Sequence, residues 1–209
     1  MTLPGDEGVE DPGAIVRRGY DLIARTYHAQ RGLEEDRERL DEFAGLLPRG
    51  ARVLDTGCGA GVPVARFLAG EGFEVTGIDV SESMLELARE HVPAATFRLM
   101  DMTELDFADG SFEGLTACYS IFHVPRELHA SLLSAFHRLL VPGGVMLVSL
   151  GHAAWEGTEP DFHGTRMFWS HFGPDEYARL LANAGFELLW GKFGTGEERH
   201  YWALARNGG

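Results

Sequence analysis

Two hydrophobic patterns alternate along the chain: short continuous apolar runs, and longer stretches in which apolar residues recur every three or four positions. The short runs predict buried strands, and the longer stretches predict amphipathic helices. The expected strands are 53–55, 74–79, 95–100, 115–120, 145–150, 186–193 and 199–205. The expected helices begin near residues 14, 34, 63, 82, 125 and 174.

Strands that alternate with helices indicate a parallel sheet covered by helices on both faces. We therefore predict an α/β fold with a Rossmann-like, doubly wound sheet that is preceded by N-terminal helices. No internal repeat or linker interrupts the pattern, so residues 13–209 are expected to form one domain, with 13–48 as a helical cap. Residues 1–12 are rich in Gly, Pro and acids and are predicted to be a disordered tail.

The segment 151–172 shows neither pattern clearly and is rich in histidine and aromatic residues. Long connections of this kind are usually functional, and this one follows a strand whose C-terminal end should face the ligand. We interpret it as a lid over the substrate. The alternative is a loop that only contributes aromatic side chains to the core.

The stretch VLDTGCGAGVPVARFLA predicts a strand, a tight glycine loop and a helix. Gly57, Gly59 and Gly61 allow a ligand to lie directly against the main chain. A dinucleotide fingerprint would need its third glycine at Val62, and a phosphate-binding loop of the Walker type would need a Lys, which is absent. Asp55 at the head of the loop instead favours a ligand with a cationic part.

Two further acids stand at the ends of the next two expected strands. Asp79 stands 22 positions after Gly57, where a Rossmann-like unit places the carboxylate that accepts both ribose hydroxyls. Val80 and Met84 are positioned to sandwich an adenine ring, although Met84 also suits the core. Asp101 comes directly after the third expected strand, at the same edge of the sheet.

Composition narrows the classes of function. The 209-residue chain carries a net charge of −14, which disfavours non-specific binding to a nucleic-acid backbone. It contains no apolar run near the ~20 residues that span a bilayer and no signal pattern, so we expect a cytoplasmic protein. Its two cysteines make a disulfide or a cysteine-based zinc site improbable, and its nine histidines show no H-E-x-x-H pattern. No metal is expected.

Five segments together resemble the successive motifs of the class I S-adenosylmethionine (SAM)-dependent methyltransferases, in the family's order and at its spacing. They are VLDTGCGAG, GIDVSESML, MDMTELDFADGSFE, the strand that ends before His123, and RLLVPGGVMLVSL. The chain looks like the small single-domain type that acts on metabolites. One departure is Phe122, because many relatives have a second histidine at that place.

This resemblance implies a mostly parallel seven-stranded sheet with an antiparallel last strand. It also implies SAM as the cofactor, S-adenosyl-L-homocysteine as the product, and in-line methyl transfer to a nitrogen, oxygen or sulfur atom of a small molecule. In such enzymes a Y-D-x-x-A-x-x-Y segment caps the cofactor, and Tyr20 and Tyr27 match its tyrosines. The remaining implied contacts are Asp55, Gly57, Gly59 and Gly61 at the methionine end, with Cys58 as a spacer between two glycines, Asp79 at the ribose, Asp101 and Met102 at the adenine, and the backbone of Cys118 and Tyr119 at the amino group.

His123 is the first candidate for a catalytic base, because it follows the fourth expected strand and histidine titrates in a suitable range. A buried structural histidine is the alternative. Tyr119, His152 and His163 are weaker candidates. The rival functions are an NAD-dependent dehydrogenase and a non-catalytic module that binds SAM or a nucleoside; an RNA methyltransferase is disfavoured by the acidic charge. The sequence does not predict an oligomeric state.

Overall fold

The computed structural model describes residues 10–30, 36–194 and 200–209. In these ranges seven strands form one sheet in the order β3-β2-β1-β4-β5-β9-β8. Neighbouring strands from β3 to β5 are parallel, whereas β9 is antiparallel to both β5 and β8. The predicted fold class, with its antiparallel last strand, is therefore confirmed. The strands are β1 Arg52–Thr56, β2 Glu74–Asp79, β3 Thr96–Leu99, β4 Phe112–Ala117, β5 Leu140–Leu150, β8 Phe186–Phe193 and β9 Tyr201–Asn207.

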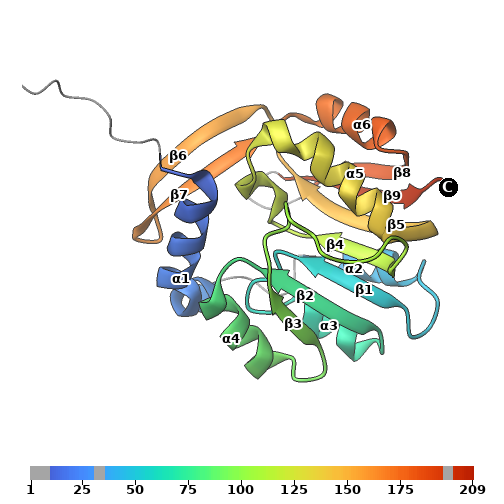
Figure 1. The fold of residues 1–209 in the computed structure, drawn as a ribbon, viewed down its shortest axis with the longest axis horizontal. Coiled ribbons are helices and arrows are strands. Elements are labelled where there is room, and N and C mark those ends of the chain that lie inside the picture. Colours follow the sequence, from blue (N-terminus) through green and yellow to red (C-terminus); the bar gives the residue numbers. More distant parts are fainter. Residues whose placement is uncertain (1–9, 31–35, 195–199) are drawn as a thin grey trace, which may run out of the picture.

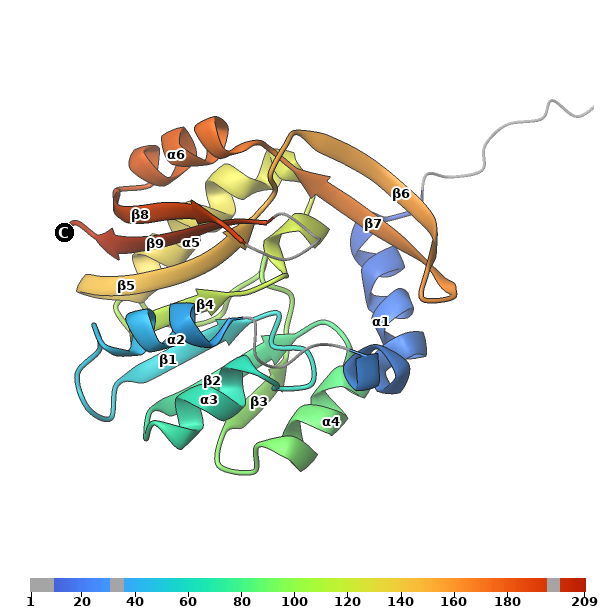
Figure 2. The same ribbon diagram turned by 180° about the vertical axis from the view of Figure 1, so that it is seen from behind.

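Helices cover both faces of this sheet (Figures 1 and 2). On one face, Leu40 and Phe43 of α2 pack with the apolar residues of α3, and on the other face Phe136 of α5 and Leu181 of α6 enter a second core. No helix in the described ranges is long and apolar enough to cross a membrane. The helices are α1 Pro12–Gln30, α2 Arg37–Ala44, α3 Val64–Gly70, α4 Glu82–His91, α5 His129–Leu139 and α6 Pro174–Asn183, with 3₁₀ turns η1 Ile121–His123 and η2 Arg126–Leu128.

Several predicted boundaries were wrong by three to five residues. Strand β4 ends at Ala117 rather than at residue 120, because the chain turns away through Tyr119, whose φ is 57°. Helix α5 begins at His129, four residues later than expected, since a 3₁₀ turn intervenes. Strand β5 already begins at Leu140, because an irregularity in its pairing with β4 accommodates the Pro-Gly-Gly stretch that was expected to precede the strand.

The segment 151–172 is a β-hairpin and not a loop. Strands β6 Trp155–Phe162 and β7 Thr165–His171 pair antiparallel in a separate two-stranded sheet. His163 and Gly164 form the turn, with φ values of 51° and 88°. The sequence of β6, with two glutamates, a glycine and a proline, gives a weak strand signal, and its pairing with β7 supplies the structure that local preference does not.

Helix α1 lies beside this hairpin, away from the faces of the main sheet (Figure 2). Ile15, Val16 and Ile23 pack against Met167 and Phe168 of β7. Another side of α1 faces α4. Of the segment 13–48, therefore, α1 joins the hairpin and α2 packs on the sheet. Most of the predicted tail, the predicted helix start at residues 34–35 and the predicted start of the last strand at residue 199 lie outside the described residues.

Gly19 sets how closely α1 approaches the hairpin. A methyl group at this position would lie 2.8 Å from Met167 Cε and 3.1 Å from the Arg166 carbonyl oxygen. We expect Gly19→Ala to lower the free energy of unfolding by about 1–2 kcal/mol, because the overpacking outweighs the gain in helix propensity. Chemical denaturation measures the change.

Gly70→Ala is the matched control, because Gly70 is also helical and has no atom within 4 Å of its would-be methyl group. This variant should be neutral or more stable by up to about 1 kcal/mol. Equal effects of the two substitutions would contradict the proposed close contact between α1 and β7.

Candidate functional site

A cavity lies at the C-terminal ends of β1, β2 and β4, and four residues of α1 form the wall that covers it. Most of the residues predicted to bind a ligand line this cavity. Val16, His28, Ala60, Val62, Met100 and Ser120 complete the lining, and none of them was among the predicted site residues. The predicted residues that the structure brings together here are Tyr20, Tyr27, Gly57, Gly59, Asp79, Val80, Met84, Met102, Tyr119 and His123.

The three loop glycines all have positive φ values, between 53° and 75°, but they serve different purposes. A side chain at Gly57 would collide with Ser120, since the two Cβ atoms would be 2.3 Å apart. Gly59 is part of the cavity lining and has open space around its would-be Cβ. Gly61 lies outside the lining and lets the loop approach Ala88 of α4.

Asp79 is the only carboxylate in the described lining of this cavity. Its Oδ2 accepts a hydrogen bond from the Gly59 N–H at 2.9 Å, and its Oδ1 accepts one from the Ser81 N–H at 2.9 Å. Burial raises the pKa of Asp79 to about 6, although these N–H donors act in the opposite direction. A carboxylate offers about four acceptor positions, so both oxygens keep capacity for a ligand's hydroxyl groups.

Ser81 carries the connection from Asp79 to helix α1. It is the N-cap of α4, and its Oγ accepts a hydrogen bond from the Met84 N–H. The same hydroxyl donates to Asp21 Oδ1 at 2.6 Å. The glycine loop, β2, α4 and α1 are thereby linked by consecutive polar contacts around one end of the cavity.

Some predicted residues lie outside this cavity. Asp55 is 1% exposed, and its Oδ1 accepts a hydrogen bond from the Thr116 hydroxyl at 2.8 Å beneath the loop. The side chains of Cys58 and Cys118 are buried, and burial raises the pKa of the Cys58 thiol well above its usual value. Asp101 accepts two hydrogen bonds from Thr103 and lines a neighbouring cavity that also includes Met102 and His123.

His123 lies where α1, η1 and the hairpin meet. Its Nδ1 is 2.9 Å from the Phe168 carbonyl oxygen, so this nitrogen carries the proton and donates it. The lone pair of Nε2 is then the acceptor for the Tyr20 hydroxyl, at 2.8 Å. The Trp169 ring lies 4.4 Å from the imidazole. Burial lowers the pKa of His123 to about 4, and the imidazole is neutral at physiological pH.

Tyr119 contributes to the lining from a strained backbone position, with a φ of 57°. Its hydroxyl donates to Asp36 Oδ1 at 3.0 Å, and its N–H donates to the Ser149 hydroxyl. Asp36 was missed by sequence reasoning, because it lies in a charged run before α2 that reads as a solvated face. Only the three-dimensional structure shows that the Asp36 side chain is buried, at 6% exposed.

His152 and His163, the weaker catalytic candidates, do not line the cavity. His152 is exposed, with its ring 6.2 Å from that of His171. His163 is exposed at the hairpin turn and meets the Tyr27 ring edge-on at 5.4 Å. Among the residues that the structure describes, no three His, Cys, Asp or Glu side chains are grouped closely enough to hold a metal ion.

The sequence of the chain is similar to those of known methyltransferases. A family model described as "Methyltransferase domain" matches residues 53–144. The 27-O-demethylrifamycin SV methyltransferase of Amycolatopsis mediterranei is 39% identical over 74% of this chain and 62% of its own length. The methyltransferase GfsG of Streptomyces halstedii is 35% identical over 77% of this chain and 59% of its length. The chain thus spans about three fifths of these two curated relatives.

One solved structure matches nearly the whole chain. It is the 1,6-didemethyltoxoflavin-N1-methyltransferase of Burkholderia thailandensis, crystallised with 1,6-didemethyltoxoflavin and S-adenosylhomocysteine. The TM-score is 0.76 at 21% identity, over 98% of this chain and 94% of that one, which establishes a common fold. With the glycine loop, the acid at the end of β2 and the sequence relatives, these findings show that the chain belongs to the class I SAM-dependent methyltransferases.

Proposed function

We propose that this protein transfers the methyl group of SAM to a nitrogen, oxygen or sulfur atom of a small-molecule acceptor. The observation that carries the proposal is the placement of Asp79, which joins the glycine loop at the edge of the covered cavity. The methyltransferase relatives support the same chemistry. When bound, SAM would supply a methyl group on a positively charged sulfur, which is already a good leaving group.

The residues of the cavity fit this cofactor. Asp79 has acceptor capacity for the two ribose hydroxyls, and the open space at Gly59 allows close approach to the main chain. The described lining contains no Lys or Arg, which suits a cation better than a pyrophosphate. Val80, Met84 and Met102 supply apolar contact for a ring, and Asp101 in the neighbouring cavity remains the proposed partner of its amino group.

The protein's own task in such a reaction is to align the reactants, exclude water and receive a proton. His123 is the proposed proton acceptor. Because Phe168 holds its Nδ1–H, its free basic position is Nε2, which faces the Tyr20 hydroxyl. The acceptor's proton would pass to Tyr20 Oη while the Tyr20 proton moves to Nε2. Alternatively, His123 is structural, and a pre-aligned amine or thiol needs no base.

Cofactor binding should depend on Asp79. We expect Asp79→Asn to weaken SAM binding in calorimetry by at least about tenfold, because a hydrogen bond to a charged group contributes about 1.5–3 kcal/mol. The unfolding free energy should change little, since the loss of a buried charge that costs about 3 kcal/mol is offset by the amide N–H₂ group, which then faces one of the two N–H donors. No SAM binding by the wild type, or equal binding by both proteins, would contradict the cofactor assignment. NADH fluorescence on mixing would favour the dehydrogenase instead.

The pKa of Asp79 also predicts opposite pH trends for binding and stability. Below pH about 6 the carboxyl group of the cofactor-free protein takes up a proton, and SAM affinity should fall up to about tenfold per pH unit. Because this pKa is raised on folding, the contribution of Asp79 to stability increases as the pH falls from about 6 toward 4. Calorimetry and thermal unfolding of the wild type and Asp79→Asn across this range measure both trends.

Tyr20→Phe separates catalysis from cofactor binding. We expect the turnover number for S-adenosylhomocysteine formation, with an acceptor found by screening hydroxyl, amine and thiol compounds, to fall by about 10²–10⁴-fold. SAM affinity should change by less than about threefold, since the aromatic ring remains in the lining. Tyr201→Phe, on β9 and outside the lining, is the control. Tight SAM binding without turnover on any acceptor would support a non-catalytic module.

A further inference from the structure

Strand β7 is fastened to the segment that carries His123 by polar contacts at alternate residues. The Phe168 carbonyl accepts the Nδ1–H of His123, and the Ser170 hydroxyl accepts the Arg126 N–H at 2.8 Å. Ser170 in turn donates to Glu156 of the paired strand at 2.6 Å. The hairpin is therefore fixed along one edge, and the orientation of His123 depends on where that edge lies.

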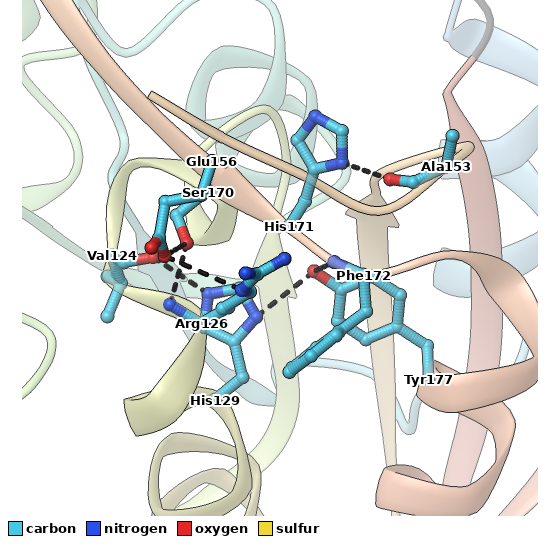
Figure 3. A network of polar contacts seen from close by, with 9 residues as sticks. All are labelled: Val124, Arg126, His129, Ala153, Glu156, Ser170, His171, Phe172 and Tyr177. Atoms are coloured by element: carbon cyan, nitrogen blue, oxygen red, sulfur yellow. Dashed lines mark hydrogen bonds and ion pairs between the residues drawn. The ribbon is translucent and has the colours of Figure 1, made fainter. Parts of the chain in front are cut away.

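A buried chain of hydrogen bonds continues this attachment beyond the end of β7 (Figure 3). His129 Nε2 is 2.9 Å from the Val124 carbonyl oxygen, so Nε2 carries the proton. Nδ1 must then accept the Tyr177 hydroxyl proton, at 3.0 Å. Tyr177 Oη in turn accepts the Phe172 N–H at 3.3 Å. The chain has one direction, from Phe172 through Tyr177 and His129 to Val124.

Both side chains in the middle of this chain keep their charge state at neutral pH. His129 and Tyr177 are each 0% exposed. Burial lowers the pKa of His129 to about 4 and raises that of Tyr177. Their rings stack with centroids 5.8 Å apart. The groups that act electrostatically on His129 are His171 and Glu127, and the pKa of His129 stays low beside them.

The two residues at the ends of this hydrogen-bond chain, Val124 and Phe172, both adjoin the groups that hold His123. Val124 follows His123 directly, where the chain leaves the turn η1. Phe172 directly follows β7 and continues the alternation of Phe168 and Ser170, of which Phe168 binds the imidazole. We propose that His129 and Tyr177 are positioning residues, which fix the His123 ring by holding both the residue that follows it, at the end of η1, and the strand that orients it. This inference rests on the proposed function only in giving His123 a catalytic role.

Packing alone does not require these polar groups. Two apolar side chains of similar volume would fill the space without burying two polar groups, each of which costs free energy unless it is hydrogen-bonded. The polar pair instead fixes two backbone groups. His129 offers only a donor to the Val124 carbonyl, and Tyr177 offers an acceptor to the Phe172 N–H, so each backbone group is held in one position. Loss of either hydrogen bond should therefore loosen the hydrogen bond that orients the His123 ring.

Tyr177→Phe tests this by nuclear magnetic resonance of ¹⁵N-labelled histidine side chains. We expect the His123 Nδ1 proton to exchange with solvent about tenfold faster, because the strand that accepts it is no longer held at its end. The pKa of His123 should rise from about 4 toward its usual value as water gains access. SAM affinity, measured by calorimetry, should stay within about twofold, since neither residue lines the cavity. With an acceptor in hand, kcat should fall at constant KM for SAM.

Tyr201→Phe is the matched control, because it also removes one tyrosine hydroxyl from this part of the core, but a hydroxyl that is no member of the hydrogen-bond chain. It should leave the His123 signals unchanged. His129→Leu removes both links, whereas His129→Gln keeps an N–H donor for the Val124 carbonyl; the glutamine variant should therefore restore part of the His123 protection that the leucine variant loses. This pair also keeps the test informative where Tyr177→Phe folds poorly.

A loss of stability in Tyr177→Phe and His129→Leu without any change at His123 would overturn the inference, since it would reveal a purely structural pair. Failure of the proposed function has a different signature. In that case wild-type protein neither binds SAM nor forms S-adenosylhomocysteine, while the His123 signals still respond to the variants.

Discussion

The cavity depends on one buried carboxylate. Asp79 receives an N–H from the glycine loop and another from the start of α4, and its neighbour Ser81 binds Asp21 of α1. Four separate elements thus meet around a charge that is costly to bury in the folded protein. A site that accepts such a cost is expected to recover it on ligand binding, when new donors reach the carboxylate. This is the usual relation between a perturbed pKa and a functional position.

The cover of the cavity relies on neutral groups. His123 links α1 to β7 through Tyr20 and Phe168, and the buried His129–Tyr177 pair supports the same region from the other side. Burial keeps both imidazoles uncharged, so each ring has one donor and one acceptor. Because a neutral histidine cannot exchange these roles without moving a proton, the hydrogen bonds around it specify a single arrangement.

The sequence predicted those elements whose local hydrophobic pattern matches the structure that they adopt in the folded protein. The bounds of β2 and β8 and the acid at the end of β2 follow from apolar runs and motif spacing. The hairpin did not, because β6 has poor strand propensity and gains its structure from its partner strand. Likewise, nothing in the local sequence shows that Asp36 and Tyr119 meet, since 83 positions separate them.

The packing of α1 has a consequence for the order in which the protein can assemble during synthesis. One side of this helix can dock on α4 early, but Ile15, Val16 and Ile23 find Met167 and Phe168 only after the hairpin has left the ribosome. Contacts between such distant parts of a chain form late and slowly. The ligand site is therefore among the last features to be completed, and a nascent chain that stops before the hairpin leaves an apolar helix face exposed to chaperones.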